Sequence, residues 1–154
     1  MTNENNQLLV IKVGQLIDGK SKSVKKDISI VINGNQIVDV KPSGELDIPE
    51  NLNYKLLDYS DKTALPGLVD SHVHLTGIGD GRAGDELVTL PDEILSINMA
   101  NNARVHLQSG VTTVRDCGAK NNTAFHLRQA VEMGIAESPR LVLSGRPLAI
   151  IGGH

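Results

Sequence analysis

Leu65-Pro66-Gly67-Leu68-Val69-Asp70-Ser71-His72-Val73-His74-Leu75 is the stretch that decides how the rest of the chain is interpreted. Pro66-Gly67 is a turn signal, and the apolar, β-branched residues after it predict a short buried strand. Side chains alternate between the two faces of a strand, so His72 and His74 are expected on the same face. Their Cα atoms would lie roughly 6.5 Å apart, which lets both imidazoles reach one zinc ion at about 2.0–2.1 Å.

Two histidines at this spacing also occur by chance on half-exposed strands, and a bare His-x-His match has a high false-positive risk. The context favours a site. The pair ends a predicted strand, a Pro-Gly turn precedes that strand, and a loop follows it that contains Gly77, Gly79, Gly81 and Gly84. In parallel α/β proteins, sites form at the carboxyl ends of strands.

After Pro66, strand patterns alternate with helix patterns, which is typical of a parallel sheet in an α/β protein. Strands are predicted over 68–74, 111–116 and 141–144. Pro91 suits the first turn of the first helix, and Gly110 is expected to cap its C-terminus. The apolar stripe predicted for this helix consists of Ile94, Ile97, Ala100, Ala103 and Leu107. The second helix is expected over 123–134, with Leu127, Ala130 and Val131 facing inward.

Residues 8–60 have a different pattern, without a helix. Strands are predicted over 8–13, 27–32, 36–40 and 54–59. Asn33-Gly34 is a hairpin signal between the second and third of these strands. Residues 1–64 are therefore expected to form a small antiparallel β-sandwich-like module, and residues 65–154 a second domain.

The stretch 66–75 resembles the first-strand signature of the metal-dependent amidohydrolase superfamily, in its imidazolonepropionase-like and metal-dependent dipeptidase branch. Two further motifs add to the resemblance: Gly110-Val111-Thr112-Thr113-Val114-Arg115-Asp116 and Ser138-Pro139-Arg140-Leu141-Val142-Leu143-Ser144-Gly145-Arg146-Pro147. The three motifs in this order are far more specific than His-x-His alone. The resemblance implies that residues 65–154 are the first three strands of a (β/α)8 barrel of the TIM type, which is incomplete here because such a barrel has eight strands.

The resemblance also implies a metal site, which His72 and His74 would anchor with one or two divalent ions, zinc being the first choice. Further ligands, a lysine, two histidines and an aspartate that shuttles the proton, are expected on later strands, so no catalytic residue is assigned within this chain. His154 is expected to face the substrate. The alternative is that it is only the last residue of the chain and has no functional role. Arg82 would bind a substrate carboxylate with two parallel hydrogen bonds from its guanidinium group. The alternative is that Arg82 is a solvated charge in a loop, without a role in binding.

Two functions follow from the resemblance. The first is a zinc-dependent hydrolase of amide or related C–N bonds in the parent protein, with a dipeptide or N-acyl amino acid as first substrate and an imidazolone or similar cyclic amide as second. The alternative is an inactive fragment or subunit that needs a complementary C-terminal chain or self-association, because an open parallel edge invites pairing.

Other polar residues near the motifs have structural interpretations. Asp70, on the face of the two histidines, is expected to be structural rather than a ligand or an orienting carboxylate. Arg115 and Asp116 are expected to form an internal ion pair. Cys117 lacks a local histidine partner and is not expected to be a nucleophile. The two remaining histidines of the predicted helices, His106 and His126, are expected at the surface or in packing.

Composition excludes several classes of protein. The net charge is −3 with both signs interspersed, which does not favour a nucleic-acid or anionic-membrane surface. A single cysteine excludes an intrachain disulfide framework and fits a reducing cytosol. No apolar run approaches the roughly 20 residues of a membrane span, and the first residues lack a signal sequence. The expected location is the cytoplasm.

Overall fold

The structure is a computed structural model, and it describes residues 7–49, 52–77, 79, 89–148 and 150. The chain divides into two compact units between Pro66 and Gly67, and each is described here by itself. Of the helices that the structure describes, none combines the length and the apolar character of a membrane span.

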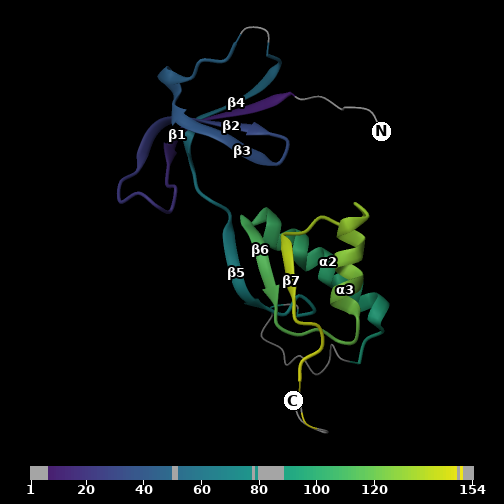
Figure 1. The fold of residues 1–154 in the computed structure, drawn as a ribbon. Coiled ribbons are helices and arrows are strands. Elements are labelled where there is room, and N and C mark those ends of the chain that lie inside the picture. Colours follow the sequence, from purple (N-terminus) through teal and green to yellow (C-terminus); the bar gives the residue numbers. More distant parts are fainter. Residues whose placement is uncertain (1–6, 50–51, 78, 80–88, 149, 151–154) are drawn as a thin grey trace. The chain divides into compact units, whose positions relative to one another are not determined.

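The first unit is a four-stranded sheet with the order β3-β2-β1-β4 (Figure 1). Its strands are β1 (Leu8–Leu16), β2 (Lys25–Asn33), β3 (Gln36–Pro42) and β4 (Tyr54–Ala64), with a short 3-10 helix η1 (Ser43–Glu45) after β3. The predicted hairpin connects β2 and β3, but its two turn residues are Gly34 and Asn35, because Asn33 still pairs with Gln36. Gly34 has φ +58° and neither asparagine has a positive φ, so the glycine comes first in the turn and the expected Asn-Gly type is wrong. Buried apolar residues of the two central strands, Val13, Leu16 and Ile28, form a small core.

The expectation of a wholly antiparallel module is wrong for one pair of strands. β1 pairs antiparallel with β2 but parallel with β4, starting at the Leu8–Tyr54 pair. A parallel pair needs a crossover connection, and the chain from the end of β1 to the start of β4 provides one through β2, β3 and η1. The predicted strand positions did not contain this information, because an apolar run does not specify the direction of its partner. The four strands form a single sheet, so the sandwich stays a prediction.

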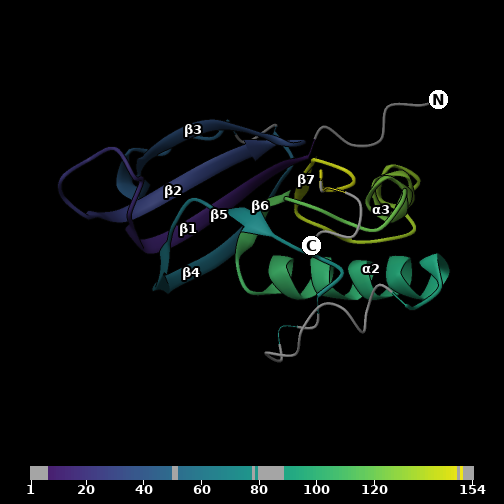
Figure 2. The same ribbon diagram turned by 90° about the horizontal axis from the view of Figure 1, so that it is seen from below.

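The second unit is a three-stranded parallel sheet in the order β5-β6-β7, with two helices against one face (Figures 1 and 2). The elements follow the predicted β-α-β-α-β order: β5 (Leu68–Val73), α2 (Asp92–Gln108), β6 (Val111–Asp116), α3 (Thr123–Glu132) and β7 (Arg140–Leu143). Side chains of the strands, the helices and the loops after β5 and β6 form one core of Val73, Leu75, Met99, Ala103, Val114, Ala119, Ala124 and Leu127.

The buried stripe of α2 differs from the predicted one. Leu95, Met99 and Ala103 are the buried residues of this helix, at a strict four-residue spacing. Ile94 and Ile97 are instead 49% and 68% exposed. Ala103 is buried as predicted, and Ala100 packs against the core. The prediction is wrong for Ile94 and Ile97, because α2 has apolar residues on more than one side and periodicity alone did not identify the side that packs. Gly110 does end the helix as predicted, with φ +89° and its N–H donating to the Leu107 carbonyl.

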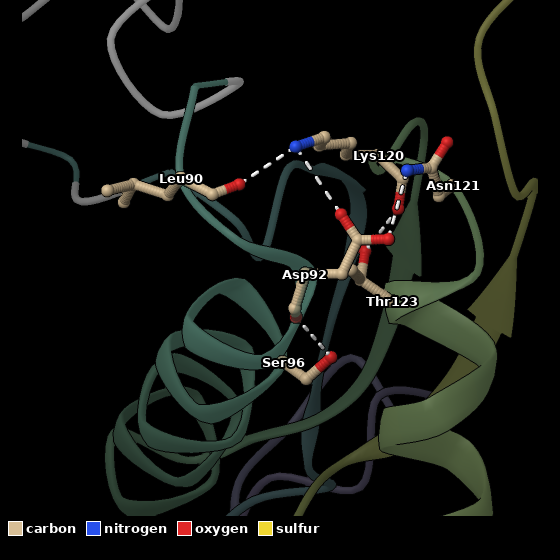
Figure 3. Close-up of polar contacts among 6 residues, drawn as sticks. All are labelled: Leu90, Asp92, Ser96, Lys120, Asn121 and Thr123. Carbon is tan, nitrogen blue, oxygen red and sulfur yellow. Dashed lines mark hydrogen bonds and ion pairs between the residues drawn. The ribbon is translucent and has the colours of Figure 1, made fainter.

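A polar cluster connects the loop after β6 to the start of α2 (Figure 3). Lys120 Nζ donates to the Leu90 carbonyl oxygen at 2.8 Å and lies 3.4 Å from Asp92 Oδ1. Asn121 Nδ2 donates to Asp92 Oδ2 at 2.9 Å. The hydrogen bond from Asn121 and the positive charge of Lys120 lower the pKa of the Asp92 carboxyl. The cluster therefore holds together two loops that leave the carboxyl edge of the same sheet.

Gly14 lies at an irregularity of β1, where the register with β4 shifts between Val13 and Gln15. A Cβ atom there would overlap the backbone carbonyl of Ser60, which cannot move without distorting the sheet. We therefore expect Gly14→Ala to lower the free energy of unfolding by about 1–3 kcal/mol, the usual cost of overpacking. Urea denaturation measures this. Gly44→Ala is the matched control, because nothing lies within 4 Å of its added Cβ. Equal stability of the two variants would contradict the close approach.

Asp92 predicts a pH dependence of stability. Its folded-state pKa is lowered, so ionised Asp92 stabilises the fold above its ordinary pKa of 3.8, and this contribution is lost as the pH falls through the lowered value. We expect Asp92→Asn to lower the melting temperature by a few degrees at neutral pH. The difference in melting temperature from the unsubstituted chain should narrow as the pH falls below about 4. Glu93→Gln is the control, because Glu93 shares the first turn of α2 and therefore the same helix dipole. A difference in melting temperature that does not change with pH would contradict the stabilising role of the Asp92 charge.

Candidate metal centre at the end of β5

His72 and His74 lie at the carboxyl end of β5, and both side chains are exposed. Their ring centroids are 5.4 Å apart, with the ring planes at 69°. The predicted strand therefore brings the two imidazoles together. This separation is compatible with one nitrogen from each ring binding the same ion, since zinc–imidazole bonds are about 2.0–2.1 Å long.

The ring of His74 has a defined orientation. Its Nδ1 lies 3.1 Å from the backbone carbonyl oxygen of Gly118. A carbonyl oxygen can only accept a hydrogen bond, so Nδ1 carries the proton and the lone pair of the neutral ring is on Nε2. Metal-binding histidines commonly donate their second N–H to such an acceptor. The donor set of this site thus fits a divalent metal ion that prefers imidazole nitrogen.

The described residues do not bring together a complete set of metal ligands. Within the ranges that the structure covers, no group of three or more His, Cys, Asp or Glu side chains is placed to hold a metal ion. A catalytic zinc site usually has three protein ligands and one open position. His72 and His74 would therefore be two ligands of a larger set.

The turn that follows His74 is held by two asparagines of α2. Asn102 Nδ2 donates to the carbonyl oxygens of Leu75 at 2.8 Å and of Gly77 at 2.6 Å. Asn98 Nδ2 donates to the Thr76 carbonyl at 2.9 Å. These asparagines were not singled out from the sequence. The signal was present, because asparagine is a poor helix former and two of them at i and i+4 share one face of α2.

Asp116, at the end of β6, is fully buried beside this turn. Its Oδ2 accepts the backbone N–H of Leu75 at 2.8 Å, and its Oδ1 accepts that of Gly118 at 3.1 Å. Burial raises the pKa of the Asp116 carboxyl, while the two amide donors oppose the shift. The expected internal ion pair of Arg115 and Asp116 is wrong. Arg115 lies on the exposed face and its Nε donates to the Ser71 carbonyl at 2.8 Å.

The other polar residues near the histidines have local partners. Asp70 Oδ1 accepts the backbone N–H of His72 at 3.1 Å, which is the structural role expected for it. The thiol of Cys117 is half-buried and contacts the backbone oxygens of Ser71 and Arg115 at 3.8 and 3.7 Å.

The two histidines of the helices have the surface or packing roles expected for them. His106 Nδ1 bonds the carbonyl of Asn102 within α2 at 2.9 Å, and His126 is exposed on α3. Neither is near enough to the pair on β5 to form a metal-binding group with it among the described residues.

A hollow of about 410 Å³ opens between the end of β5 and α2, and His74 is part of its wall. The remaining lining residues are Val73, Leu75, Gly77, Gly79, Asn102, Val105 and His106. Two other predicted site residues, Arg82 and His154, lie outside the described residues, so their assignment as substrate-binding groups stays a prediction.

Comparison with known proteins gives several relatives. The chain is 31% identical over 124 residues to an imidazolonepropionase of Streptomyces griseus subsp. griseus (strain JCM 4626 / CBS 651.72 / NBRC 13350 / KCC S-0626 / ISP 5235), covering 68% of this chain and 31% of that protein. It is 36% identical over 84 residues to a 5-methylthioadenosine/S-adenosylhomocysteine deaminase of Carboxydothermus hydrogenoformans (strain ATCC BAA-161 / DSM 6008 / Z-2901), covering 54% of this chain and 18% of that protein.

Among solved structures, a Xaa-Pro dipeptidase with methionine bound in its active site is 36% identical, with a TM-score of 0.80 over 96% of this chain and 36% of that chain. The chain thus spans about a third of the length of the imidazolonepropionase and of the dipeptidase. The model of the amidohydrolase family matches residues 63–150, more than half of the chain and the whole of the β-α-β-α-β unit through β7. The chain belongs to the amidohydrolase family.

Proposed function

We propose that this chain contributes the first metal-binding strand of a metal-dependent hydrolase that cleaves amide or related C–N bonds in small molecules or dipeptides. The observation that carries the proposal is the histidine pair of β5, in which the contact of His74 with Gly118 leaves Nε2 free to bind a metal. Membership of the amidohydrolase family supports the same reaction class.

His72 and His74 would hold one or two divalent ions, of which zinc is our first choice because imidazole nitrogen suits it. Such an ion, when bound, lowers the pKa of its water towards about 7 and polarises the scissile carbonyl. The work of this chain is to keep both rings at the end of β5. The remaining ligands and the proton-transferring carboxylate are expected on further strands of a (β/α)8 barrel, of which β5, β6 and β7 would be the first three.

The first substrate class is a dipeptide or an N-acyl amino acid, which the similarity to the Xaa-Pro dipeptidase supports. The second is an imidazolone or similar cyclic amide, which the similarity to the imidazolonepropionase supports. In either case Arg82 is proposed to bind a substrate carboxylate, and His154 to face the substrate.

A second candidate function is that of a subunit or scaffold that is inactive until a complementary chain or a second copy completes it. Among the described residues, β5 and β7 each pair with β6 alone and so leave two open edges. Leu68 and Val69 of β5 are 57% and 68% exposed, and Val142 of β7 is 48% exposed. Apolar side chains on open strand edges favour pairing with another segment.

Replacing His72 or His74 with Ala in the complete protein should remove metal and activity together. Loss of an outer-shell partner already weakens metal binding by about 10–100-fold, so loss of a direct ligand should cost at least about 100-fold. Metal content by elemental analysis and hydrolysis of a dipeptide panel and an imidazolone measure this. His126→Ala is the matched control, because His126 is exposed on α3. Normal metal content and turnover in both β5 variants would contradict the assignment.

Native mass spectrometry separates the two candidates. If the second is correct, this 16.5 kDa chain should be found with another polypeptide or a second copy, and metal should be retained only in that assembly. A single chain that binds metal by itself would contradict the subunit role. Assemblies of this chain in which no partner restores metal binding would instead count against the hydrolase.

A further inference from the structure

We propose that Asp116 is a positioning residue that fixes the ring of His74 by holding two backbone amides on either side of it. This inference rests on the proposed function, in which His74 binds a metal. One carboxylate oxygen holds the amide of Leu75, the residue next to His74 in the chain, at 2.8 Å. The other holds the amide of Gly118, the residue whose carbonyl oxygen lies 3.1 Å from His74 Nδ1.

These contacts place the backbone and the ring of His74 under the control of one side chain. The Leu75 amide determines where β5 ends, and therefore where the Cα of His74 lies. The Gly118 residue determines where the acceptor for Nδ1 lies, and therefore how the imidazole is rotated. Both amides belong to segments outside the regular ladder of β5 and β6, which ends at the pair of Val73 and Asp116. The carboxylate replaces hydrogen bonds that the sheet no longer provides there.

Asp116 can serve as a support because its own position is firmly determined. It has no exposed surface, and its carbonyl oxygen accepts the N–H of Ser144 at 3.0 Å, just after β7. The next residue, Cys117, donates its N–H to the Val73 carbonyl at 2.9 Å. Asp116 is therefore attached to the strands on both sides of β6, and the loop carrying Gly118 starts from a rigid point.

The chemistry favours a carboxylate over any neutral side chain of the same size. Two N–H groups point at the two oxygens, and an ionised aspartate offers an acceptor to each. An asparagine has one acceptor oxygen and an NH2 group that would face the second N–H. One buried amide would then lose its partner, at a cost that displacement of the loop can relieve. Displacement of Gly118 would move the acceptor of His74 Nδ1.

The test uses Asp116→Asn in the full chain, with Asp92→Asn as matched control. Asp92 is another structural carboxylate of the same unit, and its partners Lys120 and Asn121 do not contact His74. The first readout is the tautomer of His74 in the metal-free protein, from long-range 1H–15N NMR of the imidazole. The second is the affinity for Zn2+ and Co2+, from competition titration. Circular dichroism and the melting temperature monitor folding.

We expect the unsubstituted protein and Asp92→Asn to show His74 with its proton on Nδ1. Asp116→Asn should show a mixture of the two tautomers and bind Zn2+ about 10–100-fold more weakly, the usual effect of losing a group that orients a ligand. A folded Asp116→Asn protein with the single Nδ1–H tautomer and Zn2+ affinity within twofold of the unsubstituted protein would overturn the proposal. An equal loss in Asp92→Asn would overturn it too, because the effect would then be general destabilisation.

Should Asp116→Asn fail to fold, the unsubstituted protein decides the question. The amides of Leu75 and Gly118 must then exchange with solvent as slowly as those of β6, and His74 must have a single tautomer. Fast exchange of either amide, or a mixed tautomer, overturns the proposal.

Failure of the proposed function is a separate outcome. If the unsubstituted complete protein binds neither Zn2+ nor Co2+, the hydrolase assignment fails, while the tautomer of His74 still decides the role of Asp116.

Discussion

A parallel sheet provides no hydrogen bonds beyond the last paired residue of each strand, and in this chain that gap is filled by the buried carboxylate of Asp116. Burying a carboxylate is costly unless its oxygens are hydrogen-bonded, and here each oxygen accepts a backbone amide. The consequence is that the chain after β5 and the chain after β6 are held at defined positions. The ring of His74 lies between them, so its orientation depends on the same carboxylate.

The carboxyl edge of the sheet is held by several polar interactions of this kind. Asn98 and Asn102 fix the turn after β5 from the side of α2, and Lys120 connects the loop after β6 to the start of α2. In each case a side chain donates a hydrogen bond to a backbone carbonyl of a loop, where the regular hydrogen bonds of helices and strands are absent. Loops that bear binding residues are commonly mobile. Here the hydrogen bonds from these side chains restrict the motion of the backbone beside the histidine pair.

The sequence predicted what depends on local pattern and missed what depends on partners. The strands and helices of residues 68–143 were predicted within a few residues, because apolar runs and punctuating Pro and Gly residues are local signals. The parallel β1–β4 pair was missed because strand direction is not encoded in an apolar run. Asp116 was interpreted as half of an ion pair because its neighbour is an arginine. Adjacent residues of a strand point to opposite faces, so the amides of distant loops were its actual partners.

For the histidine pair too, the feature set by local pattern was predictable and the feature set by a distant partner was not. Its place at a strand end was predictable, but the hydrogen bond from His74 to Gly118 joins residues 44 positions apart and needed the fold. That bond has an energetic consequence for metal binding. A ligand whose rotamer and tautomer are already fixed loses little conformational entropy when it binds, so more of the bond energy appears as affinity. In the proposed metal site, His74 would therefore be a preorganised ligand, because its hydrogen bond to Gly118 fixes the ring before an ion binds.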